Sequence, residues 1–129
     1  MDTNKTVLIV DDDVLVLESI DLLVSMAEGF QSIRALGSAG AASHLEHAHI
    51  DVIVADVILA GSMTGIDVCR KAIEHHPEVA IVVITADNEV NRSDLPERWV
   101  FLRKPFGGEQ LLEAMDKAMA KARSEQPGA

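Results

Sequence analysis

The sequence is poor in the features that mark secreted and membrane-bound proteins. Only one of the 129 residues is a cysteine, Cys69, so no intramolecular disulfide can form, which favours a reducing compartment. No apolar run approaches the roughly eighteen residues that a membrane span needs. The first residues, Met1 to Lys5, also lack the hydrophobic segment of a signal peptide. We therefore expect a cytoplasmic protein that does not bind membranes.

Positive charge and aromatic side chains are scarce as well. The 11 Lys and Arg residues are outnumbered by 21 Asp and Glu residues, which gives a formal net charge of −10. Since nucleic-acid binding needs a basic face, we expect no direct contact with nucleic acid and favour a protein partner. Aromatic residues make up 3% of the chain and hydrophobic residues 48%. This composition predicts one globular domain with an aliphatic core.

Apolar runs typical of β-strands alternate with helical patterns along the chain. The strand-like runs cover residues 7–10, 31–36, 50–55, 80–84 and 100–103. Helices are expected over 15–27, from an N-cap at about Ser38 to residue 47, over 65–75, and after Gly107-Gly108. The second and fifth strands are interrupted by polar residues, which is typical of sheet edges. The sequence therefore predicts an α/β fold with a five-stranded parallel sheet in the order 2-1-3-4-5 and helices on both faces.

A further helix is expected between the fourth and fifth strands, within residues 87–99. Its sequence is poor in helix-forming residues, since it contains Asn88, Asn91, Ser93, Asp94 and Pro96. We therefore predict that this fourth helix is short or irregular.

Five polar residues stand at the ends of apolar runs. They are Asp11, Asp12, Asp56, Thr85 and Lys104. The carboxyl ends of parallel strands share one edge of a sheet, so these side chains should meet in one crevice. Carboxylates can hold a divalent cation there, and a hydroxyl and an ammonium can bind a phosphoryl group. The pattern indicates a phosphorylation switch.

Four segments of the chain carry a resemblance to a known family. They are V-L-I-V-D-D-D at 7–13, D-V-I-V-A-D-V-I-L-A-G-S-M-T-G at 51–65, Ile84-Thr85-Ala86 and Lys104-Pro105-Phe106. Together and in this order they resemble the receiver domain of bacterial two-component response regulators, similar to the single-domain chemotaxis type. The resemblance implies a flavodoxin-like, doubly wound domain over residues 1–123 and a flexible tail over 124–129. It also implies a phosphorylatable signalling domain and not an enzyme, apart from catalysis of its own phosphotransfer and autodephosphorylation.

The resemblance assigns roles in phosphorylation and metal binding. It implies that Asp56 is the phosphoacceptor, taking its phosphoryl group from a phosphohistidine. Asp12 would bind Mg²⁺ directly and Asp11 largely through water. Asp56 itself and the backbone carbonyl of Ile58 would supply further oxygen ligands, as suits an octahedral ion that keeps several waters.

The resemblance also implies how the phosphoryl group is bound and sensed. Lys104 would pair with one phosphoryl oxygen, while the Thr85 hydroxyl and the Ala86 backbone N–H would take another. The Lys104-Pro105 peptide bond would be cis. Thr85 and Phe101 would form the conformational switch, with Phe101 moving into the space that Thr85 vacates.

The partners follow from the same resemblance. A sensor histidine kinase or a histidine phosphotransfer protein would donate the phosphoryl group, and a downstream protein target would read the switched state. A phosphorylation-dependent dimer is one further form of output.

Two alternatives stay open at this point. Asp11-Asp12-Asp13-Val14 also resembles the opening motif of haloacid-dehalogenase-type phosphatases, in which Asp11 would be the nucleophile. That alternative requires an acidic pair after Lys104 and leaves Asp56 without a role. The other alternative is a pseudo-receiver that acts only as a non-phosphorylated interaction module, although such domains typically lose site residues and this chain retains all five.

Other polar and reactive residues have structural interpretations. We expect Asp13 to cap a helix and Cys69 to be a small buried helix residue. His44, His47 and His49 are expected at a solvated helix end. We expect Trp99 to pack beneath the irregular segment, while an exposed anchor for a partner is the other option.

Overall fold

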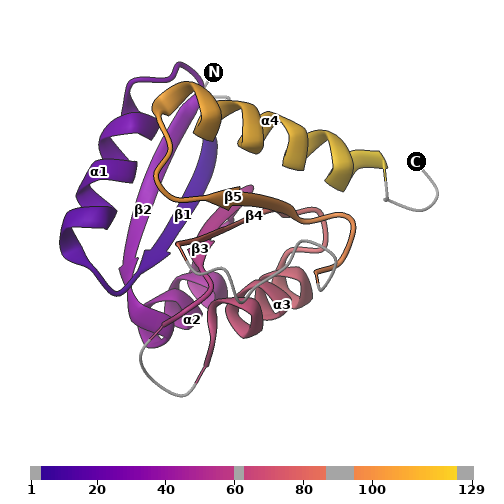
Figure 1. Cartoon of the computed structure of the whole chain (residues 1–129). Helices are drawn as coiled ribbons and strands as arrows, with labels where there is room; N and C mark the ends of the chain where they lie inside the picture. The colour runs from indigo at the N-terminus through magenta and orange to yellow at the C-terminus, as the bar shows by residue number, and fades with distance from the viewer. Residues whose placement is uncertain (1–3, 60–62, 87–94, 125–129) are drawn as a thin grey trace.

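The computed structural model describes residues 4–59, 63–86 and 95–124 (Figure 1). In chain order, these residues form β1 (Lys5–Asp11), α1 (Val14–Ser25), β2 (Phe30–Leu36), α2 (Gly37–His47), β3 (Val52–Asp56), α3 (Gly65–His75), β4 (Ala80–Thr85), β5 (Val100–Arg103) and α4 (Gly108–Ser124). Strands and helices alternate up to β4, as the sequence predicts. None of these helices combines the length and the apolarity needed to cross a bilayer.

The five strands form one parallel sheet in the order β2-β1-β3-β4-β5. This confirms the predicted order and places the weaker strands β2 and β5 at the edges. All six residues of β4 are buried, whereas β5 is buried only at Val100. Because the chain leaves β1 toward β2 on one side and returns to β3 on the other, the topological switch point lies between β1 and β3.

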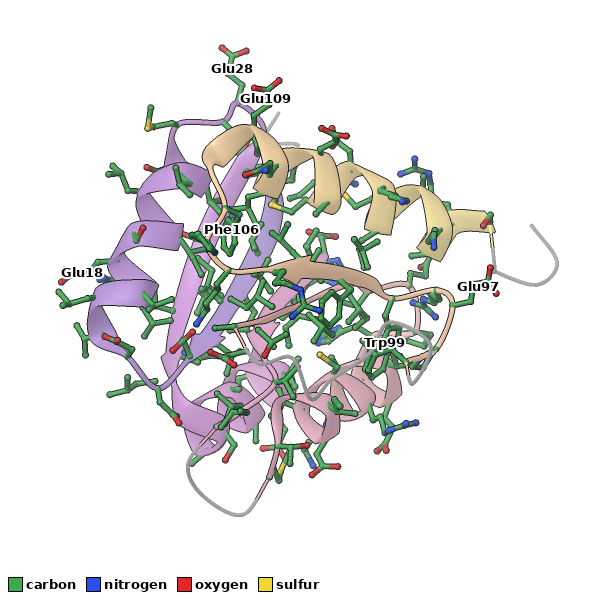
Figure 2. All side chains as sticks on the ribbon, in the orientation of Figure 1. Glu18, Glu28, Glu97, Trp99, Phe106 and Glu109 are labelled. Carbon is green, nitrogen blue, oxygen red and sulfur yellow. The ribbon has the colours of Figure 1, made fainter. Side chains whose placement is uncertain are left out.

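Helices cover both faces of the sheet (Figure 1). One face packs against α1 and α4, through residues such as Ile20 and Met115. The other face packs against α2 and α3, through residues such as Leu45 and Val68. The core is mainly aliphatic, as the composition predicts. The acidic excess lies largely at the surface, where Glu18, Glu28 and Glu109 point into solvent (Figure 2).

The helix starts confirm one capping prediction and correct another. Asp13 caps α1, because its side chain accepts a 2.9 Å hydrogen bond from the Leu15 N–H. The prediction that Ser38 caps the next helix is wrong. The helix α2 begins one residue earlier, at Gly37, and Ser38 is buried within it. Gly37 has a φ of +83°, a left-handed conformation that lets the chain turn directly from β2 into α2.

The predicted short helix before β5 falls largely on residues 87–94, which lie outside the described residues. The segment that follows, 95–99, forms turns. Trp99 lies beside α3 (Figure 2) and is 1% exposed within the core on that face of the sheet. It is therefore a packing residue and not an exposed anchor. Arg98 fixes this segment to the start of β4, since its Nη2 donates hydrogen bonds to the carbonyls of Pro77 and Val79.

Candidate functional site

The sheet brings the predicted site residues to one edge. Asp11, Asp56 and Thr85 are the last residues of β1, β3 and β4, and Lys104 follows β5 directly. Asp12 continues from Asp11 into the loop before α1. The strands thus place these side chains at the carboxyl edge of the sheet, on both sides of the switch point.

The Lys104 ammonium joins two of the carboxylates. Its Nζ lies 2.8 Å from Asp56 Oδ2 and 3.3 Å from Asp11 Oδ2. Its backbone is held by β4, because the Lys104 N–H donates a 2.9 Å hydrogen bond to the Thr85 carbonyl. The Lys104-Pro105 peptide bond is cis, the isomer that the resemblance implies. A positive charge is therefore fixed directly against the Asp56 carboxylate.

The Asp56 carboxylate is oriented at both oxygens. Oδ2 accepts from Lys104, and Oδ1 accepts a 3.0 Å hydrogen bond from the backbone N–H of Ile58. The Asp56 side chain is 14% exposed, so it remains accessible from solvent. The Ile58 side chain is exposed beside it. This orientation leaves a carboxylate that is fixed in direction and open on one side.

The start of α3 packs closely against the backbone of Asp56. The Gly65 N–H donates a 2.8 Å hydrogen bond to the Val57 carbonyl. A Cβ atom added to Gly65 would lie 1.7 Å from the Asp56 carbonyl oxygen. Only glycine therefore fits at this position, and the close approach fixes the loop that follows Asp56.

The site contains more carboxylates than ammonium groups. Burial raises the pKa of Asp11, and the neighbouring Asp56 carboxylate adds to this increase. The Asp13 backbone N–H and the Lys104 charge oppose the increase without cancelling it. Burial would lower the pKa of Lys104, but its hydrogen bond to Asp56 and the charges of Asp56 and Asp11 raise it overall. A bound cation would favour the charged forms of these carboxylates, against the burial that raises the pKa of Asp11.

The donor atoms fit Mg²⁺ better than a soft metal. Within the described residues, no three acidic, histidine or cysteine side chains are grouped so as to hold a metal by themselves. Mg²⁺ does not require such a group, because it takes one or two carboxylates and keeps several waters. The Asp11 and Asp56 carboxylates meet at Lys104, and Asp12 lies exposed next to them. The Mg²⁺ ligands predicted from the sequence, including the Ile58 carbonyl, remain a prediction.

The two expected switch residues lie on neighbouring strands. Thr85 is 1% exposed at the end of β4, and Phe101 on β5 is half-buried against the core that includes Trp99. Ala86, whose N–H is expected to bind a phosphoryl oxygen, follows Thr85 and is exposed. The sequence reasoning missed Arg103, whose guanidinium carbon lies 5.2 Å from the centre of the Phe101 ring. The alternation of side chains along a strand could have shown that positions 101 and 103 share one face.

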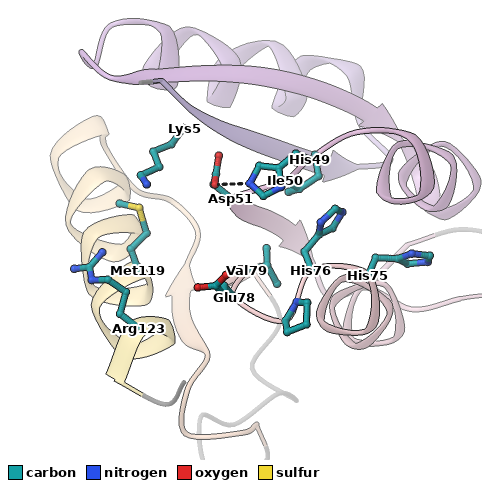
Figure 3. A pocket seen from close by; sticks show the side chains of 11 residues that line it. Lys5, His49, Ile50, Asp51, His75, His76, Glu78, Val79, Met119 and Arg123 are labelled. Atoms are coloured by element: carbon teal, nitrogen blue, oxygen red, sulfur yellow. Dashed lines mark hydrogen bonds and ion pairs between the residues drawn. The ribbon is translucent and has the colours of Figure 1, made fainter. Parts of the chain in front are cut away.

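A separate cavity of about 460 Å³ lies at the opposite, amino edge of the sheet (Figure 3). Its polar groups hold the strand starts together. The Asp51 carboxylate accepts a hydrogen bond from the Thr6 N–H and pairs with His49, and the His76 ring forms a hydrogen bond with the Leu45 carbonyl. These contacts give His49 and His76 a structural role at this edge, away from the carboxylates of the candidate site.

The comparisons with known proteins agree with this geometry. Residues 7–116 match the family model of the response regulator receiver domain. The chain is 29% identical over 112 residues to the heme response regulator HssR of Staphylococcus saprophyticus, a match that covers 83% of this chain and 48% of that protein. The chain thus spans about half the length of this curated relative.

Solved structures show the same fold. A response regulator receiver protein from Sinorhizobium medicae WSM419 superposes with a TM-score of 0.83 at 27% identity, over 92% of this chain and 97% of that one. The chemotaxis protein CheY4 of Vibrio cholerae superposes with a TM-score of 0.77 at 23% identity, over 89% of this chain and 98% of that one. These matches do not favour the phosphatase or the pseudo-receiver alternative. Receiver domains are signalling domains and not classical enzymes. The chain belongs to this family, the receiver domains of two-component response regulators.

Proposed function

We propose that this receiver domain accepts a phosphoryl group on Asp56 from the phosphohistidine of a sensor kinase or phosphotransfer protein. Receiver domains interact with such proteins, and this chain supplies an acceptor carboxylate held between Lys104 and the Ile58 N–H. In the transfer, an Asp56 carboxylate oxygen forms a bond to phosphorus as the P–N bond to imidazole breaks. The imidazole keeps the electron pair of that bond and takes up a proton. The observation that carries this proposal is the 2.8 Å contact between Lys104 Nζ and Asp56 Oδ2.

Lys104 has a second role once the acyl phosphate has formed. A phosphoryl group adds close to two negative charges and three acceptor oxygens. Because the pKa of Lys104 is raised, its ammonium stays charged and can shift its hydrogen bond from the carboxylate to a phosphoryl oxygen. The Thr85 hydroxyl and the Ala86 N–H bind another oxygen. The chain thus offers donors where the negative charge develops.

Receiver domains typically use Mg²⁺ at the phosphorylation site. In this chain Asp12 would hold the ion directly, Asp11 largely through water, and Asp56 and the Ile58 carbonyl would complete the protein ligands. When bound, the ion neutralises the crowded carboxylates and the incoming phosphoryl oxygens. The pKa of Asp11 is raised, first by burial and then by the Asp56 charge, and a cation beside it would favour the charged carboxylate.

The output is a change of conformation at the Thr85 and Phe101 pair. Phosphorylation draws the Thr85 hydroxyl toward the phosphoryl group, and Phe101 moves into the vacated space. This shifts an existing equilibrium between two states, by the difference in how the phosphoryl group interacts with each. A downstream protein, or a second copy in a phosphorylation-dependent dimer, reads the shifted state. We place this domain at residues 1–123 and expect it to act in the cytoplasm. The helix α4 ends at Ser124, and the rest of the tail predicted over 124–129 lies outside the described residues.

The test is intact mass spectrometry after incubation with acetyl phosphate, with and without Mg²⁺. The parent should gain the mass of one phosphoryl group only with Mg²⁺. Asp56→Asn should gain none and Asp11→Asn should gain less. Asp116→Asn, which removes one exposed carboxylate on α4, should behave like the parent.

Two outcomes would contradict the proposal. Turnover of acetyl phosphate that is abolished by Asp11→Asn but survives Asp56→Asn would indicate a phosphatase with Asp11 as nucleophile. No adduct on the parent, together with no response of Trp99 fluorescence to Mg²⁺ or beryllofluoride, would indicate a pseudo-receiver.

A further inference from the structure

Arg103 lies on β5 and contacts Phe101, one of the two proposed switch residues. Its guanidinium carbon is 5.2 Å from the centre of the phenyl ring. The two residues are two positions apart on the strand, so their side chains leave the same face of the sheet. This contact is within the range of a cation–π interaction.

The sheet register also places Arg103 beside Thr85. Thr85 on β4 pairs with Arg103 on β5, and Val83 pairs with Phe101 two residues earlier. Neighbouring residues of parallel strands present their side chains on the same face. Thr85, Phe101 and Arg103 therefore share one face at the carboxyl end of the sheet. Leu102, between them, packs against the opposite core with α1 and α4.

The contact depends on the position of the phenyl ring. Phe101 is half-buried against the core on the α3 side of an edge strand, and the guanidinium lies over it. The 5.2 Å distance is made by the ring in its present position, level with Val83, and a move of the ring toward Thr85 would break this arrangement. The contact then stabilises one switch position and not the other, which is the condition for biasing an equilibrium between them.

We propose that Arg103 holds Phe101 in the position described here and so opposes the switch that phosphorylation of Asp56 triggers. This inference rests on the proposed function and adds a residue that regulates it. Cation–π contacts at partly exposed sites correspond to a bias of about two- to fivefold in such an equilibrium. By linkage, loss of the contact raises the affinity of the site for a phosphoryl mimic by the same factor.

The charge of Arg103 has the opposite effect on the site. A positive charge near the carboxylates favours any anion that binds there, so its removal by itself weakens binding. The two roles of Arg103 therefore predict changes of opposite sign. Only the role through Phe101 requires the phenyl ring to be present.

The experiment is a double-mutant cycle on the affinity for beryllofluoride in the presence of Mg²⁺, measured by isothermal titration calorimetry. The variants are Arg103→Gln, Phe101→Leu and the double variant. The effect of Arg103→Gln on beryllofluoride affinity should be about two- to fivefold more favourable in the parent than in the Phe101→Leu background, where only the loss of charge remains. The same substitution in the Phe101→Leu background should give no gain. Arg103→Lys, which keeps a cation, should stay closer to the parent.

Arg123→Gln is the matched control, because it removes one exposed arginine from α4 at the opposite edge of the sheet. It should leave beryllofluoride affinity unchanged, and thermal unfolding should show that every variant is folded. A change of equal size in both Phe101 backgrounds overturns the inference while leaving the proposed function standing. Failure of the parent to bind beryllofluoride with Mg²⁺ overturns the proposed function, and the inference with it.

Discussion

Lys104 Nζ lies 2.8 Å from Asp56 Oδ2, and the same ammonium also contacts Asp11 at 3.3 Å. All three side chains are largely buried, with exposed fractions of 24% for Lys104, 14% for Asp56 and 4% for Asp11. One cation therefore serves two carboxylates away from bulk water. Removing Lys104 should cost more free energy of unfolding than its ion pairs contribute, because the Asp11 and Asp56 carboxylates would stay buried without a compensating charge.

We predict that Lys104→Met lowers the free energy of unfolding by about 1–3 kcal/mol at pH 7 without Mg²⁺. The pKa of Lys104 is raised above its ordinary value of 10.5, so the stabilising charge is fully present at that pH and is lost only as the pH rises through the folded-state pKa. Mg²⁺ should restore part of the stability, since it neutralises the same carboxylates. Urea unfolding at several Mg²⁺ concentrations measures both effects.

Lys117→Met is the control for this prediction, because Lys117 is exposed on α4. Its effect on stability should stay within about 0.5 kcal/mol and should not depend on Mg²⁺. Equal losses in the two variants would show that the Lys104 contacts do not stabilise the site.

Gly65→Ala should damage the site through the backbone. The added Cβ would overlap the Asp56 carbonyl oxygen at 1.7 Å, so the loop after β3 or the start of α3 must move. We expect the free energy of unfolding to fall by about 1–3 kcal/mol and the rate of phosphorylation by acetyl phosphate to fall with it. Urea unfolding and intact mass spectrometry measure these two changes.

Gly40→Ala gives the matched comparison within another helix. Its added Cβ would make only ordinary contacts, with Ala35 Cβ at 3.7 Å, and Gly40 lies inside α2. This substitution should raise stability by about 0.5–1 kcal/mol, because alanine is the better helix former. If Gly65→Ala were as stable as Gly40→Ala, the close approach to Asp56 would not constrain the loop.

The strand order and the placement of the site can be predicted from the sequence for simple physical reasons. Central parallel strands are covered on both faces, so their sequences are continuously apolar, and the polar interruptions at Gln31 and Arg34 indicate an edge. Functional side chains at strand ends then meet because parallel strands end at the same edge. The apolar runs that precede Asp11 and Asp56 are therefore enough to predict that these two carboxylates are neighbours.

Contacts made by loops and by individual side-chain positions cannot be predicted in this way. The approach of Gly65 to Asp56 depends on the path of the loop between β3 and α3. The Arg103 contact with Phe101 depends on the side-chain conformation of a long, flexible residue. The start of α2 differs from the prediction because Gly37 turns the chain through a left-handed conformation, which composition alone does not indicate.

Asp13→Ala tests whether the Asp13 side chain acts as a helix cap or as a metal ligand. Asp13 accepts the Leu15 N–H through its side chain, so its loss should cost about 0.5–2 kcal/mol of stability. Its backbone N–H, which donates to Asp11 Oδ1, is retained in the variant. Phosphorylation with Mg²⁺ should therefore proceed to one phosphoryl group, as in the parent. Asp13→Asn keeps the cap and should keep the stability. If either variant were no longer phosphorylated in the presence of Mg²⁺, Asp13 would be a metal ligand.

Cys69 should be unreactive in the folded protein. It is fully buried in α3, and burial raises the pKa of its thiol from 9.0 to about 12. At pH 8 the thiolate, which is the reactive form, is then nearly absent, so a thiol reagent should modify Cys69 only as fast as the chain unfolds. Rapid modification of the native protein at pH 8 would show that the thiol is accessible.

The same pKa makes stability depend on pH at the alkaline end. Between pH 9 and 12 the folded state retains the Cys69 proton while the unfolded state releases it, so alkaline pH favours unfolding. Relative to Cys69→Ala, which has no thiol to titrate, the parent should lose about 1.4 kcal/mol of unfolding free energy per pH unit in this range. Urea unfolding of both proteins from pH 8 to pH 11 measures the difference. A constant difference across that range would mean that the thiol has the same pKa in the folded and unfolded states.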